Sequence, residues 1–121
     1  MNKLKLEVEK HEEVSTVHHK ADTEKWIFFC HGFGGNKDRS SEGRCKQASE
    51  AGFNAVRFDF RGNGESDGKF IEQTLSSRIE DLKSVIEHFS PSKYALFGSS
   101  FGGKTVIHSL EDLDPEAVFL K

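Results

Sequence analysis

Four short apolar segments constrain the fold of this chain more than any other feature of its sequence. They are residues 26–30, 55–60, 94–97 and 117–120. The first three run into glycine-rich loops, which would end a strand. Apolar segments of this length are typical of strands that are buried on both faces of a parallel sheet. The sequence therefore predicts at least four strands in one buried sheet.

Helical patterns separate these segments. The clearest begins after Thr74 and ends before Pro91, with Ser77 and Glu80 at the spacing of a capping box. Its apolar stripe consists of Leu75, Ile79, Leu82, Val85, Ile86 and Phe89. Strands that alternate with helices in this way favour right-handed crossovers between parallel strands.

Two further helices and a hairpin complete the predicted fold. Residues 39–51 carry a weak helical pattern that stops at Gly52, and residues 105–113 carry another. The second of these directs four side chains inward, Val106, Ile107, Leu110 and Leu113. Residues 4–9 alternate apolar and charged side chains, and residues 14–17 can pair with them as an antiparallel edge. We expect an α/β fold with a mostly parallel sheet and an antiparallel N-terminal hairpin.

Length and charge limit the kinds of partner. A chain of 121 residues predicts a single domain over residues 1–121. Its net charge of −3 gives no reason to bind nucleic acid. The N-terminal residues lack a continuous apolar stretch, so we expect a cytoplasmic location without membrane insertion. Cys30 and Cys45 belong to no cluster of metal-ligand spacing, so we expect two buried thiols and neither a metal nor a cofactor.

The loop after the third apolar segment has the form Gly-x-Ser-x-Gly. A serine at a sharp turn between strand and helix adopts strained backbone angles, and Gly98 and Gly102 would leave room for that turn. The turn would lift the Ser100 hydroxyl clear of the sheet. It would also place the Phe101 amide at a helix N-terminus, where it can stabilise an oxyanion. Ser100 is therefore the candidate nucleophile.

The same residues also match a phosphate-binding loop. Residues 98–105 satisfy Gly-x4-Gly-Lys-Ser/Thr, which again requires a strand before and a helix after. A nucleotide site needs a later strand that ends in an acidic residue for magnesium, but the next apolar segment ends at Lys121. This counts against a nucleotide.

The loop after the first apolar segment favours acyl transfer. Such chemistry needs two backbone donors, one after the nucleophile and one from the loop of a neighbouring strand. The segment His31-Gly32-Phe33-Gly34-Gly35 has the required form, and the Phe33 amide is the candidate second donor. We expect His31 itself to be packed under the loop in a structural role.

These loops, together with residues 57–70, resemble the α/β-hydrolase superfamily. The likeness is greatest to its small esterase and serine-aminopeptidase-like branch, which includes feruloyl and cinnamoyl esterases and monoacylglycerol-lipase-like enzymes. The resemblance implies that Ser100 attacks a small carboxylic ester to form an acyl-enzyme, and that Asp59 is structural. Ser99 departs from the histidine that is commonest before the nucleophile in this branch.

The resemblance also implies that part of the fold is missing. The family supplies its catalytic acid and histidine from later strands, so residues 1–121 would be a truncated domain without its C-terminal strands and helices. The remaining histidines, His11, His18, His19, His88 and His108, are then expected to be structural or solvent-facing. We expect the isolated chain to be weakly active or inactive, and its uncovered strand at residues 117–120 to allow self-association. A catalytically silent binding scaffold is the alternative.

Overall fold

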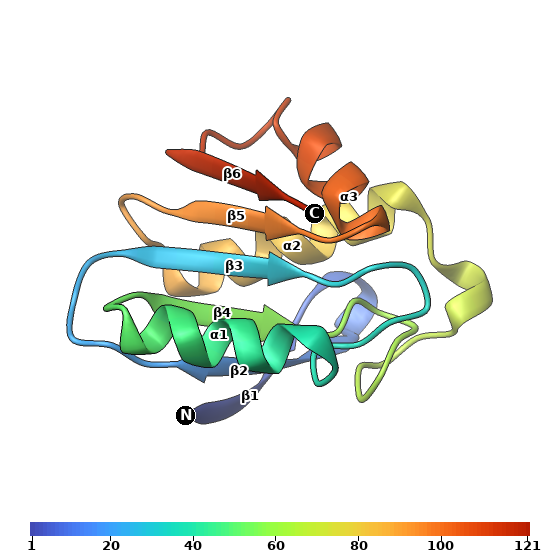
Figure 1. The fold of residues 1–121 in the computed structure, drawn as a ribbon. Coiled ribbons are helices and arrows are strands. Elements are labelled where there is room, and N and C mark those ends of the chain that lie inside the picture. The colour runs from blue at the N-terminus through green and yellow to red at the C-terminus, as the bar shows by residue number, and fades with distance from the viewer.

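Six strands form one sheet in the computed structural model, which describes residues 1–121 apart from the side chain of Ser40 (Figure 1). The strands are β1 (Asn2–Glu7), β2 (Glu13–His19), β3 (Trp26–Cys30), β4 (Asn54–Phe58), β5 (Ala95–Gly98) and β6 (Ala117–Leu120). Their order across the sheet is β1-β2-β4-β3-β5-β6. β2 pairs antiparallel with β1 and with β4, and the remaining pairs are parallel. The predicted fold class is confirmed.

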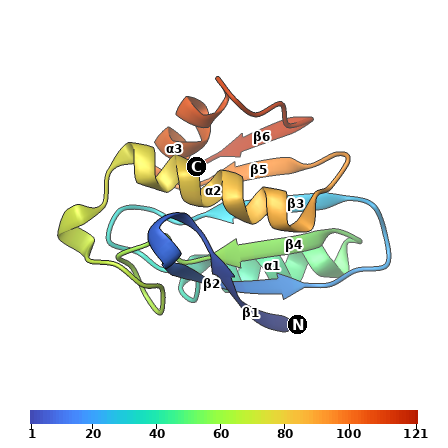
Figure 2. The same ribbon diagram turned by 180° about the vertical axis from the view of Figure 1, so that it is seen from behind.

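Helices cover both faces of the sheet. α1 (Ser40–Glu50) lies on one face, while α2 (Leu75–Phe89) and α3 (Phe101–Ser109) lie on the other (Figures 1 and 2). Two short 3-10 helices, Glu9–His11 and Phe70–Glu72, lie in connecting segments. No helix in the described part of the chain combines the length and the apolar character needed to cross a membrane.

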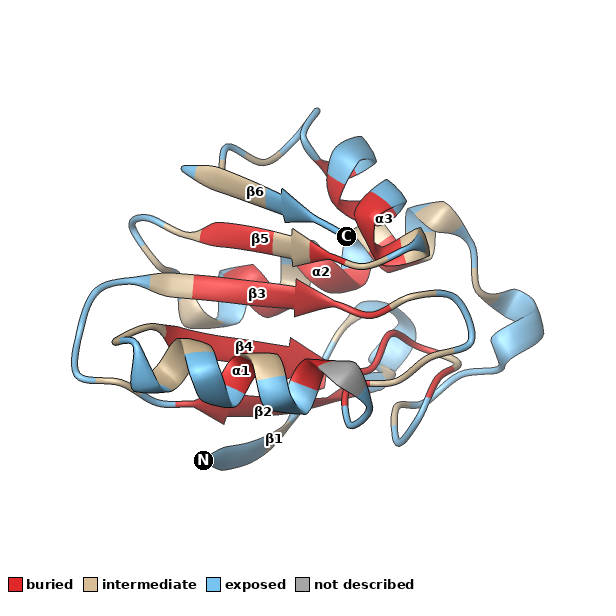
Figure 3. Cartoon of the chain, viewed as in Figure 1, coloured by how far each residue is buried: buried red, intermediate tan, exposed pale blue. Residues whose placement is uncertain are grey.

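The sheet has a hydrophobic core on each face. The larger core packs Phe28, Phe58 and Leu96 of the sheet against Leu82 and Val85 of α2, all fully buried. The smaller core lies under α1 and centres on Cys45. Figure 3 shows the resulting buried strands between more exposed helices. Burying a side chain of this size contributes roughly 1.5–3 kcal/mol, so these contacts hold the layers together.

The start of α2 differs in one detail from its prediction. The capping box consists of Thr74 and Ser77, not Ser77 and Glu80. The Thr74 side chain accepts the Ser77 amide at 3.0 Å, and the Ser77 hydroxyl accepts the Thr74 amide at 3.0 Å. Serine thus takes the place that glutamate or glutamine commonly fills, which is why the spacing alone suggested the wrong pair.

The third helix lies four residues earlier than its apolar pattern predicted. It begins at Phe101 and ends at Ser109, and Ile107 and Leu110 are 51% and 42% exposed instead of inward. Its buried face is made mostly of small residues, Gly102, Gly103, Thr105, Val106 and Ser109. Because only Val106 among these residues is strongly apolar, hydrophobic periodicity could not identify the rest of that face.

Candidate active site

Three loops meet where the parallel strands β3, β4 and β5 end. They span residues 31–39, 59–69 and 99–100, and they lie at the right-hand side of Figure 1. β3 pairs with both β4 and β5, so the loop after β3 lies between the other two. Ligands of open α/β sheets bind at this edge.

Ser100 occupies a strained turn between β5 and α3. Its φ of 56° and ψ of −120° lie in a region that side chains with a Cβ atom rarely adopt, and the residue is exposed. Two glycines allow this turn. A Cβ atom on Gly98 would approach the Gly102 carbonyl oxygen to 2.5 Å, and one on Gly102 would collide with the Cys30 carbonyl oxygen. The backbone around Ser100 therefore forms a sharp, tightly packed turn between strand and helix.

The loop after β3 lies directly against Ser100. A Cβ atom on Gly32 would be 3.3 Å from the Ser100 Cβ atom and 3.8 Å from its Oγ atom. The next residue, Phe33, places its ring 5.8 Å from the Phe101 ring, measured between centroids. The structure thus brings together the two segments that carry the predicted donors.

The two candidate donor amides are free within these turns. The Gly35 amide donates to the Gly32 carbonyl at 3.1 Å, and the Gly102 amide donates to the Ser99 carbonyl at 2.8 Å. Among the hydrogen bonds of the described residues, none uses the Phe33 or Phe101 amide. Free amides beside an exposed serine are the arrangement that an oxyanion hole requires.

The geometry gives no support to a phosphate-binding loop. The amides of Gly102 and Gly103 donate to the carbonyls of Ser99 and Ser100, so they are not available to surround a phosphate. Lys104 is exposed, with its Nζ atom 5.8 Å from the centre of the Phe101 ring. No group of three or more metal-ligating side chains occurs among the described residues.

His31 is buried beneath the loop, as predicted. Its Nε2 atom accepts the Phe60 amide at 3.2 Å, so its Nδ1 atom carries the proton and donates to the Gly32 carbonyl at 2.8 Å. Burial lowers the pKa of His31 to about 4. A neutral imidazole with both nitrogens engaged orders the loop and does not act as a base.

Asp59 ties two of the three loops together. Its carboxylate accepts the Lys37 amide at 2.6 Å, the Lys37 ammonium at 3.0 Å and the Glu65 amide at 3.0 Å. Burial acts to lower the pKa of Lys37, but hydrogen bonds to Glu65 and Asp59 raise it overall. The Gly64 backbone approaches the Asp59 carboxylate so closely that a Cβ atom would collide with it. Every one of these contacts is internal to the loops.

The other residues singled out in the sequence lie outside the three loops. His11, His88 and His108 are exposed, whereas His18 and His19 are buried and bonded to Asn54 and Arg57. Cys30 and Cys45 are free and buried, and burial raises the pKa of each thiol to about 12. β6 is an edge strand, with Phe119 and Leu120 each 52% exposed.

Two buried cations near the loops were not predicted. Lys37 is only 2% exposed although it lies in a polar loop, and no sequence signal marks it. Arg78 is fully buried on α2, three residues after Leu75 and four before Leu82. That spacing places Arg78 on the buried stripe of the helix, which was the available signal.

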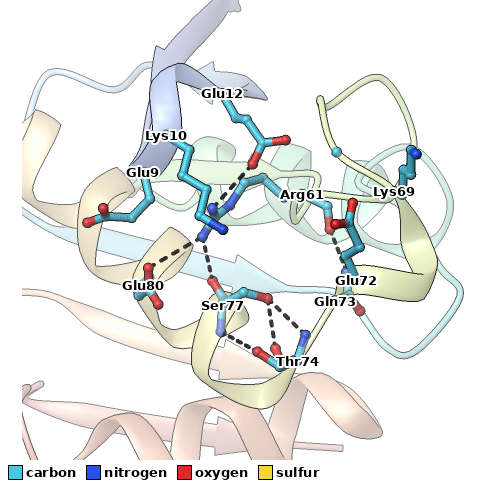
Figure 4. Close-up of a pocket in the computed structure, with 11 residues that line it drawn as sticks. Glu9, Lys10, Glu12, Arg61, Lys69, Glu72, Gln73, Thr74, Ser77 and Glu80 are labelled. Carbon is cyan, nitrogen blue, oxygen red and sulfur yellow. Dashed lines mark hydrogen bonds and ion pairs between the residues drawn. The ribbon is translucent and has the colours of Figure 1, made fainter.

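A polar pocket of about 550 Å³ lies beside this cluster, between the N-terminal hairpin and the start of α2 (Figure 4). Arg61 extends into it and contacts Glu12 at 3.5 Å and Glu80 at 3.6 Å. A second, more apolar pocket of about 490 Å³ is lined by Trp26, Phe53 and Phe119. Neither pocket is lined by Ser100.

Solved structures share this fold. Est1E from Butyrivibrio proteoclasticus, with ferulic acid bound, superposes with a TM-score of 0.84 at 23% identity, over 95% of this chain and 50% of that one. Mouse alpha/beta hydrolase domain-containing protein 10 superposes with a TM-score of 0.81 at 25% identity, over 99% of this chain and 48% of that one. The chain thus spans about half the length of these proteins.

Curated relatives are similar in sequence. Human palmitoyl-protein thioesterase ABHD10, a mitochondrial protein, is 36% identical over 75 residues, which are 62% of this chain and 24% of the relative. A putative esterase/lipase of Haemophilus influenzae is 33% identical over 94 residues, which are 76% of this chain and 31% of the relative. The chain matches only a quarter to a third of the length of these relatives.

Most of the sequence also matches a defined family. The match is to the family described as serine aminopeptidase, S33, and it extends over residues 21–119. It includes all three loops and the strained turn at Ser100. The chain therefore belongs to the S33 serine aminopeptidase family of α/β-hydrolases.

Proposed function

We propose that this chain carries the nucleophile and the oxyanion hole of a serine hydrolase that acts on carboxylic esters through an acyl-enzyme. The observation that carries the proposal is the strained, exposed Ser100 at the junction of β5 and α3, with Gly32 packed against its side chain. Strain of this kind costs about 1–3 kcal/mol, persists only where surrounding contacts hold it, and clusters at active sites.

In the proposed reaction, the Ser100 Oγ atom attacks the ester carbonyl carbon and its proton passes to a base. The carbonyl oxygen becomes an oxyanion, which the Phe33 and Phe101 amides stabilise. Phe101 is the first residue of α3, so the partial positive charge of the helix N-terminus adds to this effect. The alcohol then departs with a proton, and water hydrolyses the acyl-enzyme.

The proposal places the base and its acidic partner outside residues 1–121. Both nitrogens of His31 are engaged, and His18 and His19 are bonded within the sheet. His108 follows Ser100 by two turns of α3, which is roughly 12 Å along the helix axis. A serine without a base is a weak nucleophile, so residues 1–121 alone should be weakly active or inactive.

The relatives support ester or thioester chemistry. One similar structure holds ferulic acid, which is a carboxylic acid, and one curated relative is named a palmitoyl-protein thioesterase. Both names refer to the acyl part of an ester or thioester. A small ester is the substrate class that we propose, and neither metal nor cofactor is needed for it. The location that we propose remains cytoplasmic, with no nucleic-acid partner.

A fluorophosphonate probe tests the proposal, because it labels activated serines. We expect labelling of the protein at its full native length, and loss of labelling in Ser100→Ala. Ser99→Ala is the matched control and should still be labelled. The Ser99 backbone amide donates to the Cys30 carbonyl, and alanine keeps that amide. Absence of labelling in the unsubstituted protein would favour the silent scaffold. Labelling that survives Ser100→Ala would exclude Ser100 as the nucleophile.

A further inference from the structure

Arg78 is a buried cation without a carboxylate partner in the described part of the chain. Arg57 and Arg61 are also buried, but they pair with Asp38 and Asp81. The Arg78 side chain is fully buried and donates its hydrogen bonds to neutral groups only, although the charge of Asp81 on the same helix acts to raise its pKa. An unpaired guanidinium in the interior of a protein costs free energy of desolvation. The groups that it contacts therefore indicate its role.

Three neutral oxygens accept hydrogen bonds from Arg78. Its Nη2 atom donates to the His31 carbonyl at 2.5 Å, and its Nε atom donates to the Thr105 hydroxyl at 2.9 Å. Its Nη1 atom donates to the Gln73 side chain at 3.2 Å. The first acceptor belongs to the loop after β3 and the second to α3. Arg78 therefore joins the two segments that carry the proposed donors.

Aromatic rings hold the same guanidinium. Its central carbon lies 3.9 Å from the centre of the Phe60 ring and 5.0 Å from that of the Phe101 ring. Thr105 extends the connection, because its hydroxyl donates to the Phe101 carbonyl at 3.0 Å. Arg78 thus contacts Phe101, which carries one proposed donor. It also bonds to His31, two positions before Phe33, which carries the other.

We propose that Arg78 is a positioning residue for the oxyanion hole, setting the distance between the Phe33 and Phe101 amides. This inference rests on the proposed function of Ser100. Donors stabilise an oxyanion only when both lie about 2.7–3.1 Å from it, and a displacement of roughly 1 Å can cost 10²-fold in rate.

A planar, charged group suits this role better than any other side chain. Three donor nitrogens in one rigid plane reach three acceptors on different segments at once. Burial lowers the pKa of Arg78 to about 10, so the group stays charged at neutral pH. The charge also strengthens the hydrogen bond to the His31 carbonyl.

The test compares Arg78→Met with Arg57→Met in the protein at its full native length. Both substitutions remove a buried guanidinium, but Arg57 bonds to His19 and to the Lys37 and Asp38 end of the loop after β3, and not to the His31 carbonyl or to α3. With a short-chain p-nitrophenyl ester, we expect Arg78→Met to lower kcat about 10- to 100-fold per folded molecule, with KM changed less than about threefold. Arg57→Met should lower the folded fraction and leave kcat per folded molecule within about threefold.

A boronic acid inhibitor distinguishes positioning from general stability, because its bound form mimics the tetrahedral intermediate. Arg78→Met should weaken boronate binding more than substrate binding, and Arg78→Lys should recover part of the loss. A purely structural role would leave both kcat per folded molecule and the boronate affinity unchanged, and that result would overturn the proposal.

Thr105→Val provides a second route if Arg78→Met does not fold. It removes the hydroxyl that accepts from Arg78 and donates to the Phe101 carbonyl, while keeping the side-chain shape, and we expect kcat to fall about 3- to 10-fold. An unchanged kcat in folded Thr105→Val would then overturn the inference. Failure of the unsubstituted protein to react with the fluorophosphonate probe would instead count against the proposed function itself.

Discussion

The Asp81 carboxylate holds the Arg61 side chain and the Arg61 backbone together beneath the loop that follows β4. It accepts the guanidinium Nε atom at 2.7 Å and the Arg61 amide at 2.9 Å. Asp81 is fully buried on α2, so this pair joins the helix to the loop.

Replacement of Asp81 by asparagine should therefore destabilise the fold strongly. The substitution weakens two hydrogen bonds to a charged acceptor and leaves Arg61 with only its longer contacts to Glu12 and Glu80, at a cost of about 1.5–3 kcal/mol. Urea unfolding at pH 7 measures the change in the free energy of unfolding. Glu80→Gln is the control, because Glu80 is the half-exposed partner of Arg61 at 3.6 Å and should cost less than about 1 kcal/mol. Equal effects of the two variants would contradict this prediction.

Gly102→Ala should disturb both the fold and the reactive serine. The added methyl group would collide with the Cys30 carbonyl oxygen, so α3 must shift away from β3. We expect a loss of more than about 2 kcal/mol in the free energy of unfolding and loss of fluorophosphonate labelling. Gly43→Ala on α1 is the matched control. A Cβ atom at Gly43 would contact nothing within 4 Å, and the change should stabilise the helix by about 0.5–1 kcal/mol.

The neutral state of His31 predicts a dependence of stability on pH. Its pKa of about 4 lies below the ordinary value of 6.5, so the unfolded chain binds a proton more readily than the folded chain between these values. This contribution to stability is complete above pH 6.5 and is lost as the pH falls toward 4, by about 3 kcal/mol.

Urea unfolding at several pH values tests the role of His31 against His31→Gln. The variant should lose less stability than the parent between pH 6.5 and 4. The comparison isolates His31, because burial raises the pKa of Asp81 to about 6 in both proteins and its titration cancels. Parallel stability curves for the two proteins would disprove the assignment of a buried neutral imidazole.

The exposed edge of β6 should make residues 1–121 associate with themselves. Phe119 and Leu120 are half-exposed on a strand whose outer edge has no neighbour in the sheet. Light scattering should show a mass that rises with concentration, and Phe119→Lys should suppress that rise. Ile71→Lys serves as the control, since Ile71 is 90% exposed but lies on the 3-10 helix Phe70–Glu72. Equal suppression by both variants would exclude a specific role for the edge.

Local sequence patterns predicted where the strands and helices lie, but predicted less well how these elements pack against one another. Strands β3 to β6 follow the apolar segments, and α2 follows its stripe closely from Leu75 to Phe89. The face of α3 was missed because glycines and hydroxyl side chains form it. The order of strands in the sheet depends on packing between distant segments, which no local pattern contains.

The candidate site divides in the same way. Ser100 and the loop at His31 could be identified because glycines at fixed spacing mark turns that need close backbone contact. Arg78 and Lys37 could not be assigned a role, because their importance lies in acceptors that are remote in sequence. For Arg78 and the His31 carbonyl, that separation is 47 residues.

The placement of β3 between β4 and β5 also determines when the reactive serine can form during folding. The Ser99 amide donates to the Cys30 carbonyl, about 70 residues earlier in the chain. Contacts between such distant segments form slowly, because a long loop must first close. The strained turn at Ser100 gains its contact with Cys30 only after β5 has joined β3. Reactivity toward the probe should therefore return only with the last phase of refolding, after most of the helical signal has recovered.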